Sequence, residues 1–291
     1  MKKDNTIRDL VQAMHDELRD IYPENEIKSL TEIVFTRVTH LKKRHHLHIY
    51  QDHPVDAERV LQIKDIIKQL KSGKPIQQIL GETAFYDLEI KVSPEVLIPR
   101  QETEELVDWM ISDLKGRPVK ILDIGTGTGC IAIALAGYLK EAQVHALDVS
   151  SHILELAREN ARINKVNIRL ILADILKEPS SESPLAQETY QVIVSNPPYV
   201  RESEKSRMHP NVRDHEPDKA LFVSDEDPLI FYRQILLFAR HHLAPEGLIW
   251  FEINESLGRK MITLLKEEGY RDIQLKKDIH NKHRMIKAQK P

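Results

Sequence analysis

The chain has few cysteines, no excess of basic residues and no long apolar run near its start. Its one cysteine, Cys130, excludes an internal disulfide and a zinc cluster built on several thiolates. The sequence contains 42 lysines and arginines and 45 aspartates and glutamates, so the chain lacks the basic excess that is usual in proteins that wrap nucleic acid. Because Met1 to Asn5 are polar and lead directly into a helical pattern, we expect no signal peptide, no membrane span and a cytoplasmic location.

The first third of the chain has apolar residues at helical spacing in three successive segments. They lie at residues 7–21, 27–41 and 60–70, and the third ends at Ser72-Gly73 before Pro75. Three helices of this length predict a small bundle over residues 1–75. The chain has 291 residues, and at roughly 150 residues per domain we expect one further, larger domain.

In residues 76–100 the helical spacing of apolar residues gives way to short runs in which apolar and polar residues alternate. One run extends from Phe85 to Val92 and another from Val96 to Ile98, with Ser93-Pro94 between them. Alternation of this kind, interrupted by a turn signal, predicts a β-hairpin that joins the helical bundle to the rest of the chain.

From residue 101 to residue 291, apolar runs alternate with amphipathic segments. The runs predict strands near residues 119–124, 144–148, 168–172, 191–195 and 248–253, with helices between them. Repeated strand–helix units predict a mostly parallel, doubly wound, Rossmann-like α/β sheet with helices on both faces. The polar stretch from Arg201 to Ala220 is long for a connection and is a candidate lid.

A glycine-rich loop follows the first of these strands and opens a helix. In Gly125-Thr126-Gly127-Thr128-Gly129, backbone N–H groups suit an anionic group, and the missing side chains let a ligand approach closely. Cys130 stands where a dinucleotide-binding fingerprint would have a further glycine. The loop therefore fits the methionine part of S-adenosylmethionine better than a dinucleotide.

Acidic residues end the next two strands. Asp148 is placed to hold the two ribose hydroxyls of the cofactor, and Asp174 to accept from the adenine amino group, with Ile175 against the ring. An aspartate at a strand end is often only a helix cap, so these assignments depend on the neighbouring motifs.

The tetrapeptide Asn196-Pro197-Pro198-Tyr199 ends the fourth strand. The Asn196 side-chain oxygen and the Pro197 carbonyl can each accept one N–H of a planar nitrogen, while the Tyr199 ring stacks on it. Both prolines fix φ and donate no N–H, so the turn is a stiff set of acceptors. We expect all four residues to contact the substrate, Asn196, Pro197 and Tyr199 to be catalytic, and Asn196 to lie beside the cofactor as well. The four motifs end successive strands, where open α/β sheets bind ligands, and this indicates a class I methyltransferase.

At family level the chain resembles the N5-glutamine methyltransferases that modify peptide chain release factors. The resemblance rests on Gly73-x-Pro75-Ile76-Gln77, Leu97-Ile98-Pro99-Arg100 with Thr103-Glu104, Asp123 to Gly129, Ser195 to Tyr199, and Glu216-Pro217-x-x-Ala220-Leu221. It implies a helical N-terminal domain that grips the release factor, and methyl transfer from S-adenosylmethionine to the glutamine of a Gly-Gly-Gln loop. The chain departs from the family pattern at Gln78, Gln101, Ser224 and Asn281.

Other functions share parts of this pattern. Adenine N6-methyltransferases carry the Asn-Pro-Pro-Tyr element, and a related glutamine methyltransferase acts on a large-subunit ribosomal protein. A non-catalytic cofactor-binding module is the third alternative. The histidines at positions 45, 46 and 48, with His40 and His53 nearby, lie among basic residues without carboxylate or thiolate partners, so we expect no metal. We expect a monomer that meets the release factor in a transient 1:1 complex, without stable nucleic-acid binding.

Overall fold

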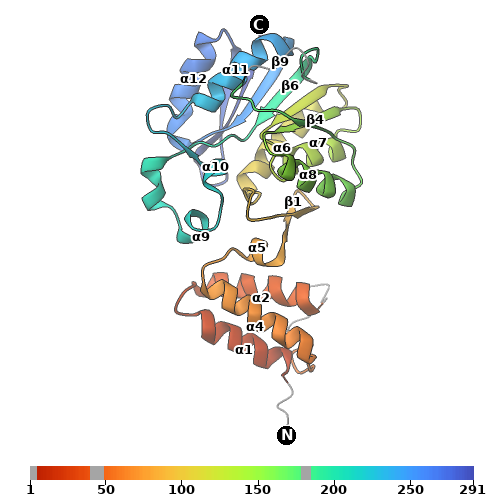
Figure 1. The fold of residues 1–291 in the computed structure, drawn as a ribbon, viewed down its shortest axis with the longest axis vertical. Helices are drawn as coiled ribbons and strands as arrows, with labels where there is room; N and C mark the ends of the chain where they lie inside the picture. Colours follow the sequence, from red (N-terminus) through yellow and green to blue (C-terminus); the bar gives the residue numbers. More distant parts are fainter. Residues whose placement is uncertain (1–4, 40–48, 178–184) are drawn as a thin grey trace. The chain divides into compact units, whose positions relative to one another are not determined.

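The computed structural model describes residues 5–39, 49–177 and 185–291, which form two compact units (Figure 1). The first unit contains the chain up to Leu80 together with Pro210–His215. The second contains Gly81–His209 and Glu216–Pro291. The chain therefore leaves the second unit after residue 209 and returns to it at Glu216.

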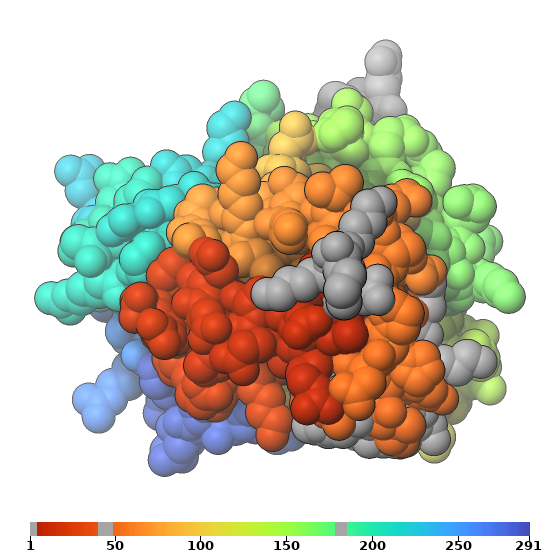
Figure 2. Space-filling view, turned by 90° about the horizontal axis from the view of Figure 1, so that it is seen from below, coloured from red at the N-terminus to blue at the C-terminus, as the bar shows by residue number. Residues whose placement is uncertain are grey.

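The first unit is a helical bundle, as the apolar spacing predicts. It consists of α1 (Ile7–Leu18), α2 (Glu24–Thr39), α4 (Ala57–Lys71), the short α5 (Ile76–Leu80) and, from the later segment, α9 (Pro210–Arg213). The helices bury a common apolar core, in which Met14, Phe35 and Ile63 are inaccessible to solvent. Exposed apolar side chains remain on this unit, whose surface is red to orange in Figure 2: Ile21, Ile33 and Leu61.

A β-hairpin follows the bundle, but its turn lies earlier than the sequence suggests. Strands β1 (Glu82–Phe85) and β2 (Leu88–Lys91) are antiparallel and pair Phe85 with Leu88. Tyr86 and Asp87 form the two-residue turn with φ of 49° and 62°, the left-handed conformation that such tight hairpins require. The expected turn at Ser93-Pro94 is therefore wrong, and residues 96–98 form no strand.

The second unit contains a seven-stranded sheet in the order β10-β11-β9-β6-β3-β4-β5. The five strands from β9 to β5 are parallel, and β11 and β10 are antiparallel to their neighbours, which confirms a mostly parallel α/β sheet. The strands are β3 (Lys120–Ile124), β4 (Gln143–Asp148), β5 (Arg169–Leu172), β6 (Tyr190–Ser195), β9 (Leu243–Glu252), β10 (Arg271–Lys277) and β11 (His283–Gln289).

Helices cover both faces of this sheet, as expected for a doubly wound fold. They are α6 (Gln101–Leu114), α7 (Cys130–Tyr138), α8 (Ser151–Ile163), α11 (Ile230–His242) and α12 (Gly258–Glu267). Alternate residues of one strand point to opposite faces. Thus Ile121 of β3 packs in the cluster with α6 and α7, whereas Leu122 packs in the cluster with α11 and α12.

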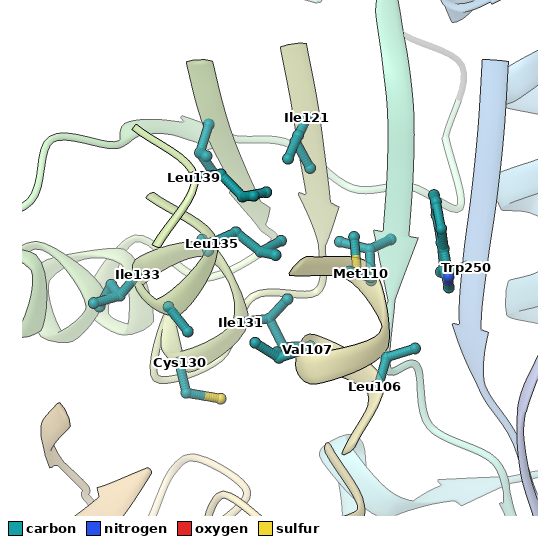
Figure 3. Packing of buried hydrophobic residues seen from close by; sticks show 14 of the residues in the cluster. Leu106, Val107, Met110, Ile121, Cys130, Ile131, Ile133, Leu135, Leu139 and Trp250 are labelled. Atoms are coloured by element: carbon teal, nitrogen blue, oxygen red, sulfur yellow. The ribbon is translucent and has the colours of Figure 1, made fainter. Parts of the chain in front are cut away.

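Figure 3 shows the cluster on the α6 and α7 side, where Leu106, Met110, Ile131 and Trp250 pack together. Cys130 belongs to this cluster, and burial raises the pKa of its thiol to about 12. Cys130, directly after the glycine loop, therefore fills a packing position in this core.

The polar stretch after the Asn-Pro-Pro-Tyr element is made of short pieces. They are β7 (Val200–Arg201), the 3-10 helix η1 (Glu202–Arg207), α9, α10 (Asp218–Leu221) and β8 (Phe222–Val223). The part from Pro210 to His215 is fixed to the first unit, because the Gln78 side chain donates to the His215 carbonyl over 2.8 Å.

Candidate active site

The sequence motifs meet along one edge of the sheet. Strands β6, β3, β4 and β5 are parallel neighbours in that order, so their carboxyl ends lie side by side. Asn196 follows β6, the glycine loop follows β3, Asp148 ends β4 and Asp174 follows β5. The sheet order thus brings all four predicted groups to the same edge.

The glycine loop folds back on β4. The N–H groups of Gly125 and Thr126 both donate to the Leu147 carbonyl over 2.9 Å, and the Gly127 N–H donates to Asp148 Oδ2 over 3.1 Å. Gly125 and Gly127 have φ of 72° and 55°, and a Cβ added at either position would meet no atom within 4 Å. The loop therefore borders open space that a side chain would fill, which fits a bound cofactor.

Gly129 has a different role from the other two glycines. Its φ is 82°, and an added Cβ would lie 3.1 Å from the Ala157 Cβ of α8 and 3.1 Å from Ile133 Cδ1. Its N–H already donates to the Thr126 carbonyl. Gly129 therefore permits close packing of the loop and α7 on α8.

Two threonines and an aspartate lie beneath the loop. Thr126 Oγ1 donates to Asp123 Oδ2 over 2.6 Å, and the side chains of Thr126 and Thr128 are both buried. Asp123 is inaccessible to solvent, and burial raises its pKa to about 7. Its Oδ1 has no hydrogen-bond partner among the described residues. These side chains shape the loop from within.

The two strand-end aspartates differ in their surroundings. Asp148 accepts from the Gly127 and Ser150 N–H groups, each over 3.1 Å, which leaves acceptor positions on its carboxylate for two hydroxyls. Asp174 accepts from the Leu176 N–H over 3.0 Å and has Lys177 Nζ 3.5 Å away. Ile175 is half-buried against the α11 and α12 side of the core.

The Asn-Pro-Pro-Tyr element is held by side chains from distant parts of the sequence. Ser195 Oγ donates to the Ile124 carbonyl over 2.7 Å, which ties β6 to the start of the glycine loop. Asn196 Nδ2 donates to Thr103 Oγ1 over 3.3 Å. Tyr199 is partly buried, and its hydroxyl donates to Glu252 Oε1 over 2.9 Å. Of the two prolines, Pro197 is buried and Pro198 is partly buried.

Glu252 is the buried centre of these contacts. Thr103 Oγ1 donates to its Oε2 over 2.6 Å, and Tyr232 donates to its backbone carbonyl over 3.0 Å. Burial raises the pKa of Glu252, while the hydrogen bonds from Thr103 and Tyr199 and the charge of Arg284 act in the opposite direction and favour its carboxylate form. Burial beside this carboxylate raises the pKa of Tyr199.

Glu216 is a second buried carboxylate, and it holds the segment before α6. Glu216 accepts from the Ile98 N–H and forms an ion pair with Arg100. Its carboxylate thereby fastens the Leu97-Ile98-Pro99-Arg100 motif to the point at which the chain re-enters the second unit.

The sequence motifs did not include Thr103, Glu252 or Asn160 as site residues. Glu252 ends β9, the strand next to β6, so the strand-end position that marks Asp148 marks it as well. Asn160 is fully buried on α8, where its side chain donates to the Thr128 carbonyl and exchanges hydrogen bonds with the Lys91 backbone. An asparagine inside an amphipathic helix is unfavourable unless its side chain has such partners.

Across 5–39, 49–177 and 185–291, no group of three or more histidine, cysteine, aspartate or glutamate side chains is placed to hold a metal ion. The histidines at positions 40, 45, 46 and 48 lie outside the described residues. Within the described part, no helix has the length and apolar character needed to cross a membrane.

Comparison with known proteins supports this arrangement. The chain matches the Methyltransferase small domain family over residues 102–212 and the PrmC N-terminal domain family over residues 9–81. A crystal structure of a methyltransferase from Pyrococcus furiosus superposes with a TM-score of 0.51 at 19% identity, covering 81% of this chain and 99% of that chain. This likeness shows the fold alone.

Similar sequences cover nearly the whole chain. A release factor glutamine methyltransferase of Flavobacterium psychrophilum is 46% identical over 93% of this chain and 94% of its own length. The protein of the same name from Bacteroides thetaiotaomicron is 40% identical over 93% of this chain and 95% of its own length. The similarity includes the N-terminal helices as well as the sheet, and the chain therefore belongs to the family of release factor glutamine methyltransferases.

Proposed function

We propose that the protein transfers a methyl group from S-adenosylmethionine to the side-chain amide nitrogen, N5, of the glutamine in the Gly-Gly-Gln loop of a peptide chain release factor. One observation carries the proposal beyond family membership. The Asn196 NH₂ group donates a hydrogen bond to Thr103, and none of the described residues donates a hydrogen bond to Asn196 Oδ1. An amide oxygen in this state is available to accept an N–H of the substrate.

The cofactor is S-adenosylmethionine, and the residues at the sheet edge fit it. Gly125 and Gly127 leave room above the loop, and Asp148 retains free acceptor positions for ribose hydroxyls. We assign Thr126, Thr128 and Gly129 to shaping this site, and Asp174 with Ile175 to the adenine end. When bound, the cofactor supplies an electrophilic methyl group attached to a sulfonium.

The acceptor residues make the amide nitrogen more reactive. A carboxamide nitrogen donates its lone pair into its own π system and is a poor nucleophile while it stays planar. Acceptance of its N–H groups by Asn196 Oδ1 and the Pro197 carbonyl favours a pyramidal nitrogen, an effect realised mainly in the transition state. The Tyr199 ring packs on the planar amide, and Pro198 holds the turn rigid.

Positioning supplies most of the rate acceleration. Well-oriented reactants can remove about 7 to 11 kcal/mol of a barrier. No general base is needed, because the proton of the methylated nitrogen can leave to water after transfer. The Glu252 carboxylate already accepts hydrogen bonds from the hydroxyls of Thr103 and Tyr199.

The substrate assignment rests on the relatives and on the first unit. The curated relatives are named release factor glutamine methyltransferases, and the similarity spans the helical unit. We assign the helices of residues 1–75 to gripping the protein substrate, for which the exposed Ile21, Ile33 and Leu61 offer apolar contact. The enzyme acts as a monomer in a transient 1:1 complex, because the factor must leave to work on the ribosome.

A labelling experiment tests the proposal. Purified protein and labelled S-adenosylmethionine are offered a release factor, the same factor with its loop glutamine changed to alanine, ribosomal proteins, and DNA. We expect label on the intact release factor, none on the alanine variant, and a mass increase of one methyl group at the loop glutamine. Label on DNA or on a ribosomal protein, with none on the release factor, would overturn the assignment.

A further inference from the structure

We propose that Thr103 and Glu252 are positioning residues that fix which end of the Asn196 carboxamide faces the acceptor nitrogen. The inference rests on the proposed function, since it concerns the same amide. The two ends of a carboxamide are alike in shape and opposite in hydrogen bonding: the oxygen only accepts and the NH₂ only donates. A flipped Asn196 would therefore turn two donors toward the N–H groups of the substrate.

The hydrogen-bond directions follow from the chemistry of Glu252. Thr103 donates its single O–H proton to Glu252 Oε2 over 2.6 Å, and the ionised form of Glu252, which the hydrogen bonds from Thr103 and Tyr199 favour, can only accept. The Thr103 oxygen is then left as an acceptor, and the Asn196 NH₂ donates to it over 3.3 Å. This ordered chain leaves Asn196 Oδ1 as the end that faces away from Thr103.

Glu252 is itself fixed. Its second oxygen accepts from Tyr199 over 2.9 Å, and its backbone carbonyl accepts from Tyr232 over 3.0 Å. The Glu252 side chain is almost inaccessible to solvent. The same carboxylate therefore holds both members of the Asn-Pro-Pro-Tyr element that carry polar side chains, Asn196 through Thr103 and Tyr199 directly.

Thr103 reaches this site from a rigid position. It is buried in the first turn of α6, whose Leu106 and Met110 are inaccessible to solvent in the core (Figure 3). Thr103 lies 93 positions before Asn196 and 149 positions before Glu252. This contact gives a physical role to the Thr103-Glu104 pair of the motif that precedes the glycine loop.

Two substitutions of Thr103 separate its hydroxyl from its bulk. Thr103→Val keeps the shape and removes the hydroxyl, whereas Thr103→Ser keeps the hydroxyl and loses a methyl group. At saturating S-adenosylmethionine and release factor, we expect Thr103→Val to lower kcat about tenfold, and Thr103→Ser to recover most of that loss. The dissociation constant for S-adenosylmethionine should stay within about twofold of wild type in both, because neither touches the glycine loop or Asp148.

A double substitution tests whether Thr103 acts through Asn196. If it does, Thr103→Val should lower kcat by less than about twofold when Asn196 is already alanine. A general structural role would instead multiply the two losses. Equal effects of Thr103→Val in the presence and absence of the Asn196 amide would overturn the inference.

A spectroscopic readout keeps the inference independent of the assigned substrate. The side-chain NH₂ resonances of Asn196, identified by their loss in Asn196→Ala, should shift in Thr103→Val and stay near their wild-type positions in Thr103→Ser. If wild-type enzyme fails to methylate any release factor, the proposed function fails while these resonances still decide the positioning role. Unchanged resonances in Thr103→Val contradict the positioning role whatever the substrate.

If Thr103→Val does not fold, Glu252→Gln is the alternative variant for the same test. The glutamine keeps the volume, but one of its two polar atoms becomes a donor and cannot accept from both hydroxyls. A folded Glu252→Gln protein should show lower kcat with an unchanged dissociation constant for the cofactor, and wild-type kcat in that protein would overturn the inference.

Discussion

The two halves of the sheet edge are built in different ways. Over β3 and β4, the site consists mainly of backbone, namely glycines with positive φ and loop N–H groups, together with the strand-end carboxylate of Asp148. Over β6 and β9, it consists of side chains that hold one another. Asn196, Thr103, Glu252 and Tyr199 form one hydrogen-bonded chain, in which Thr103 and Glu252 are buried and the other two are partly buried. The first half leaves space for a ligand, whereas the hydrogen bonds of the second half fix the orientation of the Asn196 amide.

The difference corresponds to two tasks. Binding a cofactor needs space and a few fixed acceptors, which a loop and a strand end supply with residues close together in sequence. Directing a reaction at one nitrogen needs an acceptor that cannot rotate, which several distant residues must hold. The halves should therefore respond differently to substitution, and the following changes test that separation.

The largest expected effect is on cofactor binding by Gly127→Ala. The added Cβ enters the open space over the loop at a φ of 55°, where an L side chain is also strained. We expect the dissociation constant for S-adenosylmethionine to rise about 100-fold, equivalent to about 2.8 kcal/mol, as measured by isothermal titration calorimetry.

Gly116→Ala is the matched control for backbone strain. Gly116 has a φ of 72°, and a Cβ there also meets no atom within 4 Å, but it lies in the exposed turn before β3. Both variants should lose about 1 to 2 kcal/mol of stability, and only Gly127→Ala should lose cofactor affinity. Equal affinities in the two variants would show that the space over Gly127 is not the cofactor site.

A smaller effect is expected from Asp148→Asn. The substitution keeps the shape and removes the charge that strengthens hydrogen bonds from hydroxyls, so affinity for S-adenosylmethionine should fall about tenfold. Asp174→Asn is the comparison, because Asp174 already has Leu176 N–H and Lys177 as neighbours. A larger loss in Asp174→Asn than in Asp148→Asn would move the main polar anchor of the cofactor to β5.

The smallest effect concerns the stability of the cofactor-free protein. The pKa of Asp123 is raised from 3.8 to about 7 by burial, so the folded state favours its neutral form. Its contribution to stability is complete below the unfolded pKa and is lost as pH rises through the folded value. Between about pH 5 and about pH 6, wild type should lose about 1 kcal/mol of unfolding free energy relative to Asp123→Asn, measured by urea denaturation. Parallel pH profiles of the two proteins would show that the pKa of Asp123 is not raised.

Much of the fold can be predicted from the sequence because the signals are local. Buried parallel strands read as apolar runs, and the predicted strands of the α/β domain begin or end within a few residues of those observed. The hairpin turn was missed because Tyr86 and Asp87 are not a typical turn pair, whereas Ser93-Pro94 is. The antiparallel strand β10 at the edge of the sheet and its neighbour β11 were missed because their charged residues hide the apolar pattern of a strand.

In the site, too, the residues with a local sequence signal could be predicted and the others could not. The glycine loop, Asp148 and the Asn-Pro-Pro-Tyr element can be predicted from their positions at the ends of strands. Glu252 also ends a strand, but nothing in the local sequence shows that it contacts Thr103, 149 positions earlier. Thr103 lies in a helix, and its contact with Asn196 spans 93 positions, so no local pattern predicts its role. Asn281, where the family usually has glycine, adopts a φ of 62° that asparagine tolerates, so this departure leaves the turn intact.

The most direct test of the separation between the halves is the Asn196→Ala variant, measured for cofactor affinity and for single-turnover methylation of the release factor at saturating cofactor. We expect the turnover rate to fall about tenfold or more, while the dissociation constant for S-adenosylmethionine changes less than about threefold. Near-normal turnover, or a loss of affinity as large as that of Gly127→Ala, would contradict the account.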